Sequence, residues 1–157
     1  MEKCEKTNAM RILESKGENY EPIYLSVIPS DGVDAASRMG RDPASVFKTL
    51  VTVGSDLGHY VFVIPVGETL DLKKAAKAAG VKSVEMLPQK QLFPLTGYVH
   101  GGCSPIGMKK VFPTVLDETA ILYERIVTSA GKLGVFLSVG PGAFERTVGA
   151  NYADLVR

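Results

Sequence analysis

The chain has 157 residues, of which 45% are hydrophobic, and its formal net charge at pH 7 is +1. A chain of this length can enclose one core, so we expect a single domain over residues 1–157. The small net charge argues against a broad electrostatic grip on nucleic acid but leaves room for a local basic patch. The longest apolar stretches have only the length of strands, which argues against a transmembrane helix and a membrane partner.

The N-terminus is polar and charged, and it lacks the apolar region of a signal peptide. The two cysteines, Cys4 and Cys103, are too few for a disulfide framework. Both features favour a reducing compartment, so we expect a cytoplasmic protein.

Helical and extended patterns alternate along the chain, with no linker, repeat or low-complexity tract between them. Asp42 and Pro43 form a helix-start signal, and Thr69 is a candidate N-cap. The predicted helices cover residues 8–16, 32–39, 70–79, 88–95 and 142–148. The predicted strands cover residues 23–28, 47–53, 60–66, 98–101, 114–116, 126–129 and 134–139. Tight turns and helices both separate these strands, which predicts an α/β fold with a mixed sheet.

One lysine interrupts the apolar strand predicted at residues 47–53. Alternation along the strand places Lys48 and Leu50 on one face and Thr49 on the other. Both faces are largely apolar, which indicates a covered strand. A lysine there must either reach out to water or face a polar cavity, where it would carry a function. The alternative is an edge-strand lysine that discourages aggregation.

Three glycines and a proline mark residues 101–107, which read GGCSPIG and which we name the glycine loop. Glycine allows positive φ and close backbone approach, and Pro105 fixes the direction in which the chain leaves. Free peptide N–H groups in such a loop can hold an anion or a polarised carbonyl oxygen, and Lys109 and Lys110 follow with positive charge. A tight turn between two strands is the simpler interpretation of the loop alone.

The remaining reactive side chains form no familiar catalytic or metal-binding pattern. His59 and His100 are the two histidines, and His100 is the better candidate because it adjoins the glycine loop. Cys103 is a candidate nucleophile, but a small buried thiol is the simpler interpretation, since only the lysine pair could lower its pKa. No spacing of cysteine and histidine fits zinc, and no dense carboxylate cluster fits a hard metal. We therefore expect neither a metal nor a cofactor.

Several segments, taken in order along the chain, resemble one family. They are KTNAM (6–10), VFKTLV (46–51), LDLKKAAKA (70–78), VEM (84–86), TGY (96–98), GGCSPIG (101–107), KK (109–110) and SAGK (129–132). Together they resemble the YbaK/EbsC family of free-standing Cys-tRNA(Pro) deacylases, which is related to the insertion domain of bacterial prolyl-tRNA synthetase. The resemblance implies a mostly antiparallel sheet that curls into a barrel-like core with helices packed outside it.

The resemblance also implies a reaction and its site. The substrate is a cysteinyl ester of tRNA whose own thiolate attacks the ester carbonyl, so the protein's task is chiefly positioning. Lys48 matches the lysine that the family requires, and it would hold the carbonyl oxygen or a phosphate of the terminal adenosine. Gly101 and Gly102 match the loop that makes room for the aminoacyl group. The further substrate-binding residues that we expect are Thr49, Ser104, Pro105, Ser129 and, as the pocket tyrosine, Tyr24.

The expected partners are the end of an aminoacyl-tRNA and prolyl-tRNA synthetase, which the resemblance suggests as the source of the mischarged product. Two alternatives stay open. One is deacylation of another mischarged amino acid, such as alanine. The other is a non-catalytic module that binds an aminoacyl-tRNA end or a nucleotide. The combination of Lys48 with a complete glycine loop favours the catalytic interpretation.

Overall fold

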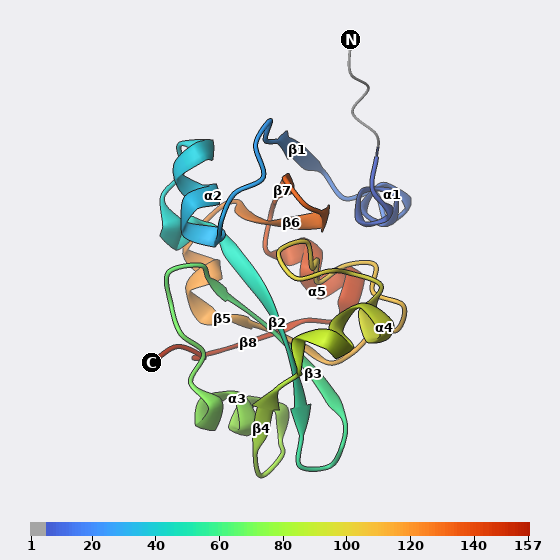
Figure 1. Cartoon of the computed structure of the whole chain (residues 1–157), viewed down its shortest axis with the longest axis vertical. Helices are drawn as coiled ribbons and strands as arrows, with labels where there is room; N and C mark the ends of the chain where they lie inside the picture. Colours follow the sequence, from blue (N-terminus) through green and yellow to red (C-terminus); the bar gives the residue numbers. More distant parts are fainter. Residues whose placement is uncertain (1–5) are drawn as a thin grey trace.

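The computed structural model describes residues 6–157, so Cys4 lies outside the described residues (Figure 1). The α-helices are α1 (Asn8–Ser15), α2 (Gly32–Met39), α3 (Leu72–Ala79), α4 (Leu92–Thr96) and α5 (Gly142–Val148). The 3-10 helices are η1 (Pro43–Ser45), η2 (Gln89–Gln91) and η3 (Glu118–Leu122). The strands are β1 (Tyr20–Tyr24), β2 (Phe47–Gly54), β3 (His59–Pro65), β4 (Val84–Met86), β5 (Thr114–Asp117), β6 (Ile126–Lys132), β7 (Val135–Val139) and β8 (Asn151–Ala153).

The strands form two sheets. The smaller sheet has the order β1-β7-β6 and is antiparallel throughout. The larger sheet has the order β4-β2-β3-β5-β8. In it β2 pairs antiparallel with β3 and β4, whereas β3 with β5 and β5 with β8 are parallel pairs. The predicted α/β fold with a mixed, mostly antiparallel arrangement is therefore confirmed.

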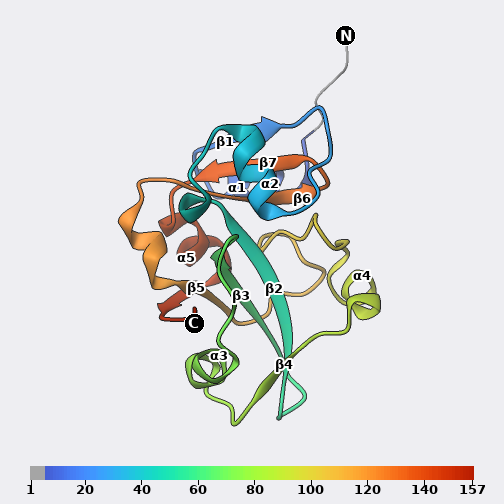
Figure 2. The same ribbon diagram turned by 60° about the vertical axis from the view of Figure 1, so that its left-hand side comes forward.

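The expectation that one sheet curls into a barrel is wrong. Val46, the residue before β2, forms an isolated parallel bridge with Val127 of β6, and β2 itself belongs to the larger sheet. Figure 2 shows the smaller sheet, with α2 in front of it, above the long β2–β3 hairpin. Apolar packing joins the two sheets where a barrel would continue its backbone hydrogen bonds.

Local signals placed some element ends correctly and others wrongly. The helix at Gly32–Met39 is as predicted, because the Asp31 carboxylate caps its start and Gly40, in the left-handed region, ends it. The next predicted helix begins later than expected, since Asp71, and not Thr69, accepts hydrogen bonds from its first N–H groups. The first strand ends at Tyr24 and does not extend to residue 28, and residues 98–101 form a turn in place of a strand. Strands β4 and β8 were not predicted.

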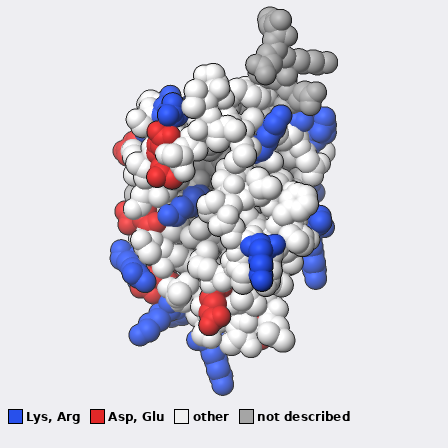
Figure 3. Space-filling view, viewed as in Figure 1, with Lys and Arg blue, Asp and Glu red and all other residues white. Residues whose placement is uncertain are grey.

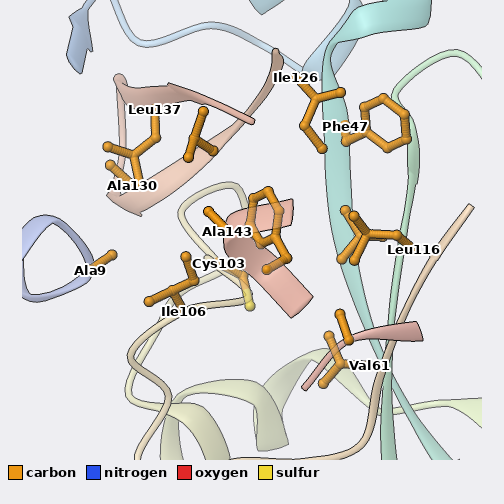
Figure 4. Close-up of a cluster of buried hydrophobic side chains, with 14 of the residues drawn as sticks. Ala9, Phe47, Val61, Cys103, Ile106, Leu116, Ile126, Ala130, Leu137 and Ala143 are labelled. Carbon is orange, nitrogen blue, oxygen red and sulfur yellow. The ribbon is translucent and has the colours of Figure 1, made fainter. Parts of the chain in front are cut away.

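The largest buried apolar cluster fills the space between the two sheets. It takes side chains from α1, β2, β6, β7 and α5, and the labelled examples in Figure 4 converge from these elements. Cys103 and Ile106 of the glycine loop point into this cluster. Part of the loop is therefore core, which fixes the position of the remainder.

Candidate functional site

Lys48 is the second residue of β2 and lies opposite Ile64 of β3. Val46 shares its face of the strand. Val46 belongs to a buried apolar cluster beneath α2, whose other buried members are Ala35, Ala36, Val66, Val127 and Phe136. Lys48 is itself half-buried and follows Val46 of this cluster by two positions on the same face of the strand.

Partial burial lowers the pKa of Lys48 below its ordinary value of 10.5, because the ammonium loses water contacts. The charges of Glu68 and Asp31 act in the opposite direction and offset part of this effect. Neither carboxylate is among the ion pairs that the described residues form. The Lys48 ammonium is thus partly desolvated without a close counter-charge, and a ligand atom carrying negative charge would be stabilised there.

Ser129 lies on the strand next to Lys48. The bridge between Val46 and Val127 sets the start of β2 alongside β6, and Lys48 and Ser129 each follow their bridge residue by two positions. The Ser129 side chain is half-buried, and its hydroxyl accepts a hydrogen bond from the Gly131 N–H at 3.2 Å. The hydroxyl proton is left to donate to a ligand. The structure therefore brings these two predicted residues to neighbouring positions.

The glycine loop packs against the turn between β6 and β7. Gly101 is exposed, with a φ of 86°, and a Cβ there would lie 3.2 Å from Leu133 Cδ2. Gly102 is buried, and a Cβ there would lie 3.2 Å from the backbone nitrogen of Leu133. The space beside Gly102 is therefore already taken by the protein, whereas Gly101 faces outward.

Residues 25–31, which we name the rim segment, connect that turn with the surroundings of Lys48. Its first residue, Leu25, donates its N–H to the Gly134 carbonyl at 2.8 Å. Its last residue, Asp31, is one of the two carboxylates whose charge acts on Lys48. Val27 and Ile28, between them, are exposed apolar side chains. Figure 3 shows the surface hollowed between α2 and β6, with a basic side chain at the lower edge of the hollow. We take this hollow as the candidate site.

Ser104 and Pro105 are buried in the glycine loop, away from the surface. The Ser104 hydroxyl accepts the Ile106 N–H at 3.1 Å, which closes a tight turn. The Tyr98 hydroxyl donates to the Ile106 carbonyl at 2.6 Å and holds the same turn from below. Ser104 thus has a structural partner within the loop, and Pro105 is buried beside it.

Cys103 is also part of the interior. It is a free, buried thiol, and burial raises its pKa to about 12. A thiol with that pKa stays protonated at neutral pH, so it is a poor nucleophile. The interpretation of Cys103 as a small buried thiol is confirmed.

Thr49 lies on the face of β2 opposite Lys48, and Tyr24 lies at the end of β1. Thr49 is on the face that packs into the cluster between the sheets. Within the described part of the chain, its Oγ1 is the buried side-chain polar atom without a hydrogen-bond partner. Tyr24 is exposed at the end of β1, and its hydroxyl lies 4.0 Å from the Met10 sulfur of α1.

Two acidic residues near Lys48 were not predicted as part of the site. Asp31 reads from the sequence only as a helix cap, and Glu68 lies in the turn after β3. Their approach to Lys48 depends on how α2 and this turn fold back over β2. No local sequence signal could have revealed it.

The histidines occupy ordinary positions. His100 is exposed in the turn before Gly101, and the His59 ring packs edge-on against Phe112 with a centroid distance of 5.5 Å. Over residues 6–157 no group of three or more His, Cys, Asp or Glu side chains could hold a metal ion. In the same range, none of the helices has the length and apolarity needed to cross a membrane.

Comparisons with known proteins place this arrangement among tRNA-editing proteins. The chain is 46% identical over 154 residues to EbsC of Enterococcus faecalis (strain ATCC 700802 / V583), which is named a candidate Cys-tRNA(Pro)/Cys-tRNA(Cys) deacylase. This match covers 96% of the chain and 93% of EbsC. A solved structure described as a candidate trans-editing enzyme for prolyl-tRNA synthetase superimposes with a TM-score of 0.85 at 26% identity. That match covers 98% of this chain and 99% of the other.

A second curated relative is a multidomain enzyme. The chain is 32% identical over 124 residues to the proline–tRNA ligase of Shouchella clausii (strain KSM-K16), covering 78% of this chain but 21% of the ligase. The family model of the aminoacyl-tRNA editing domain matches residues 30–147, a range that includes Lys48, the glycine loop and Ser129. The chain belongs to the aminoacyl-tRNA editing domain family.

Proposed function

We propose that this protein is a trans-editing deacylase that clears Cys-tRNA(Pro), and that the surface around Lys48 receives the cysteinyl ester. Family membership and the EbsC relative support the reaction class. The partly desolvated ammonium of Lys48 is the observation that supports the location. One editing domain spanning residues 1–157 would carry the activity.

The reaction follows from the chemistry of the substrate. The cysteine thiolate attacks its own ester carbonyl, the bond to the ribose oxygen breaks, and a thiolactone forms. The ribose oxygen takes up the proton that the thiol gave up, and water then opens the thiolactone to free cysteine. Because the attack is intramolecular, holding the ester in a reactive conformation can contribute roughly 7–11 kcal/mol. The protein therefore needs no nucleophile of its own, which agrees with the burial of Cys103.

Lys48 would stabilise the negative charge that develops on the carbonyl oxygen. A fixed cation in a partly dry site is effective because little solvent screens it and little reorganisation is needed. Ser129, on the neighbouring strand, would donate its hydroxyl proton to the ester or to the terminal ribose. Gly101 and the exposed Val27 and Ile28 of the rim segment would border the aminoacyl group.

Prolyl-tRNA synthetase is the proposed source of the substrate and the proposed partner that selects the tRNA. The match to part of a proline–tRNA ligase supports this link, because the same domain serves both chains. A cytoplasmic location goes with this proposal, since tRNA charging takes place there.

A deacylation panel tests the substrate assignment. The protein is incubated with Cys-, Ala- and Ser-tRNA(Pro), and loss of each ester is followed over time. We expect fast loss of the cysteinyl ester and slow loss of the seryl ester, because an alcohol is a poor nucleophile at neutral pH. Equal rates for the cysteinyl and seryl esters would rule out attack by the substrate thiol. A preference for the alanyl ester would assign the protein to another mischarged amino acid. If no ester is cleaved, the non-catalytic alternative stands.

A further inference from the structure

The part of the sequence from Met86 to Leu116 contains no aspartate or glutamate, although the whole chain carries 17 of them. Lys90, Lys109 and Lys110 lie in this part, and all three are exposed. The aromatic ring of Phe93, between them in the sequence, is 57% exposed. We name the surface formed by these four side chains the basic face.

Lys90 lies on η2 and Phe93 on α4, and Lys109 and Lys110 lie in the loop that follows α4. Lys110 borders a separate small pocket together with Val148 of α5. The Lys109 ammonium lies 5.6 Å from the centre of the Phe93 ring and donates a hydrogen bond to the Pro94 carbonyl at 3.3 Å. These two contacts link the loop to α4. Beside them is an open hollow of about 490 Å³, lined by His59, Lys90, Gln91, Pro94 and Leu95. This volume is comparable to that of sites for small ligands, and no carboxylate lines it.

The charge of this face is not neutralised within the molecule. The ion pairs among the described residues involve Lys6, Arg38, Lys74, Arg125 and Arg146, and none uses a lysine of the basic face. Glu85 of β4 is exposed and lies opposite Val53, which in turn pairs with His59, but it is not among the ion pairs of the described residues. Asp56 accepts the Tyr60 hydroxyl proton at 2.6 Å, and Asp117 is fully buried. In Figure 3 the acidic side chains gather over the side that carries α2, whereas the side that carries α4 shows basic side chains with almost no acidic ones.

We propose that the basic face binds the phosphate backbone of the tRNA acceptor arm while the ester lies beside Lys48. The proposal rests on the proposed function for its choice of nucleic acid. His59 lies opposite Val53, five residues further along β2 than Lys48, which separates the two sites by roughly 17 Å. A few nucleotides next to the ester would cover that distance. The three ammonium groups would neutralise phosphates, and the exposed Phe93 ring offers a surface for an unpaired base.

Binding of an uncharged RNA hairpin with the acceptor-arm sequence tests the proposal by fluorescence anisotropy. Three phosphate contacts predict that affinity falls roughly 20- to 40-fold between 50 and 200 mM salt. The combined variant Lys90→Glu, Lys109→Glu, Lys110→Glu should lose most of the binding and most of this salt dependence. The matched control, Lys73→Glu and Lys77→Glu on α3 with Lys82→Glu just after it, reverses the same number of exposed charges elsewhere and should bind as wild type does.

The hairpin carries no amino acid, so this result does not depend on whether the protein is a deacylase. If the activity is also present, the basic-face variant should raise KM for Cys-tRNA(Pro) and leave kcat nearly unchanged. Equal hairpin binding by the wild type, the basic-face variant and the control would overturn the proposal. So would a basic-face variant that binds RNA normally but no longer associates with prolyl-tRNA synthetase, because the occupant would then be a protein.

Discussion

The glycine loop and the start of β2 both stand out in the sequence, yet the structure uses them in opposite ways. In the glycine loop, the Ser104 hydroxyl has a hydrogen-bond partner within the loop. The space that a side chain at Gly102 would need is occupied by the Leu133 backbone. At the start of β2, Lys48 is half-buried with a lowered pKa and without an ion-pair partner among the described residues. Close packing marks a residue that the fold needs. A partly desolvated charge without an ion-pair partner is the kind of group for which we propose a ligand as partner.

The largest expected effect on stability lies within the glycine loop. A Cβ at Gly107 would lie 2.6 Å from the Tyr98 hydroxyl, and its φ is 87°. Backbone strain and overpacking together predict that Gly107→Ala lowers the free energy of unfolding by about 2–5 kcal/mol. Gly80→Ala is the matched control, because φ there is 75° but a Cβ would have no neighbour within 4 Å. Urea unfolding measures both, and equal losses would show that the loop is not tightly packed.

Alkaline pH should test the close packing of the glycine loop without a mutation. The pKa values of Cys103 and Tyr98, ordinarily 9.0 and 10.0, are both raised by burial to about 12. The folded protein therefore holds protons that the unfolded chain releases, and this contribution to stability is complete below about pH 9 and lost as the pH rises to about 12. Unfolding curves across this range should show the decline. In Cys103→Ser, which has no titrating thiol at this position, the decline should be smaller, and an identical decline would mean that the thiol is not buried.

Gly101 is the one position of the loop where substrate contact is expected. Its φ of 86° predicts that Gly101→Ala loses about 1–2 kcal/mol of stability through backbone strain, and the end of the Leu133 side chain must also shift slightly. If the aminoacyl group lies against it, deacylation by the folded fraction should fall further than that loss explains. The deacylation rates of Gly101→Ala and Gly80→Ala, measured well below the melting temperature of both variants, show whether Gly101 contacts the substrate. A rate that follows the folded fraction alone would make Gly101 a turn residue only.

The smallest effect on activity is expected at Cys103. The proposed chemistry uses the substrate's thiol, so Cys103→Ser should deacylate Cys-tRNA(Pro) at nearly the wild-type rate, with some loss of stability from the buried hydroxyl. Single-turnover rates are the suitable measurement. Loss of activity in a variant that is still folded would return the role of nucleophile to the protein.

Short-range patterns account for what the sequence predicted correctly. Alternation and β-branched residues mark the β2–β3 hairpin, and a cap with a terminal glycine marks α2. Strands β4 and β8 have three residues each and exist only through distant pairing, so no local pattern could reveal them. The two-sheet arrangement likewise depends on whether β2 pairs with β6, which is a property of the packed chain.

In the candidate site, too, local patterns predicted single residues but not contacts between distant segments. The sequence marks Lys48 as unusual because the rest of its strand is apolar, and Ser129 follows from the resemblance. The burial of Ser104 and Pro105, and the approach of Asp31 and Glu68 to Lys48, arise from contacts between distant segments. Thr49 follows Lys48 directly, and alternation already placed it on the other face of β2.

Single-turnover deacylation of Cys-tRNA(Pro) by Lys48→Ala, measured together with its melting temperature, tests the central claim most directly. We expect a loss of roughly 100- to 1,000-fold, as for removal of one group that stabilises an oxyanion, with a melting temperature that does not fall. Lys48→Arg should also be slow, because a planar guanidinium is larger and directs its protons differently. Lys73→Ala, at an exposed lysine of α3, is the control. A folded Lys48→Ala protein with the wild-type rate would contradict the account.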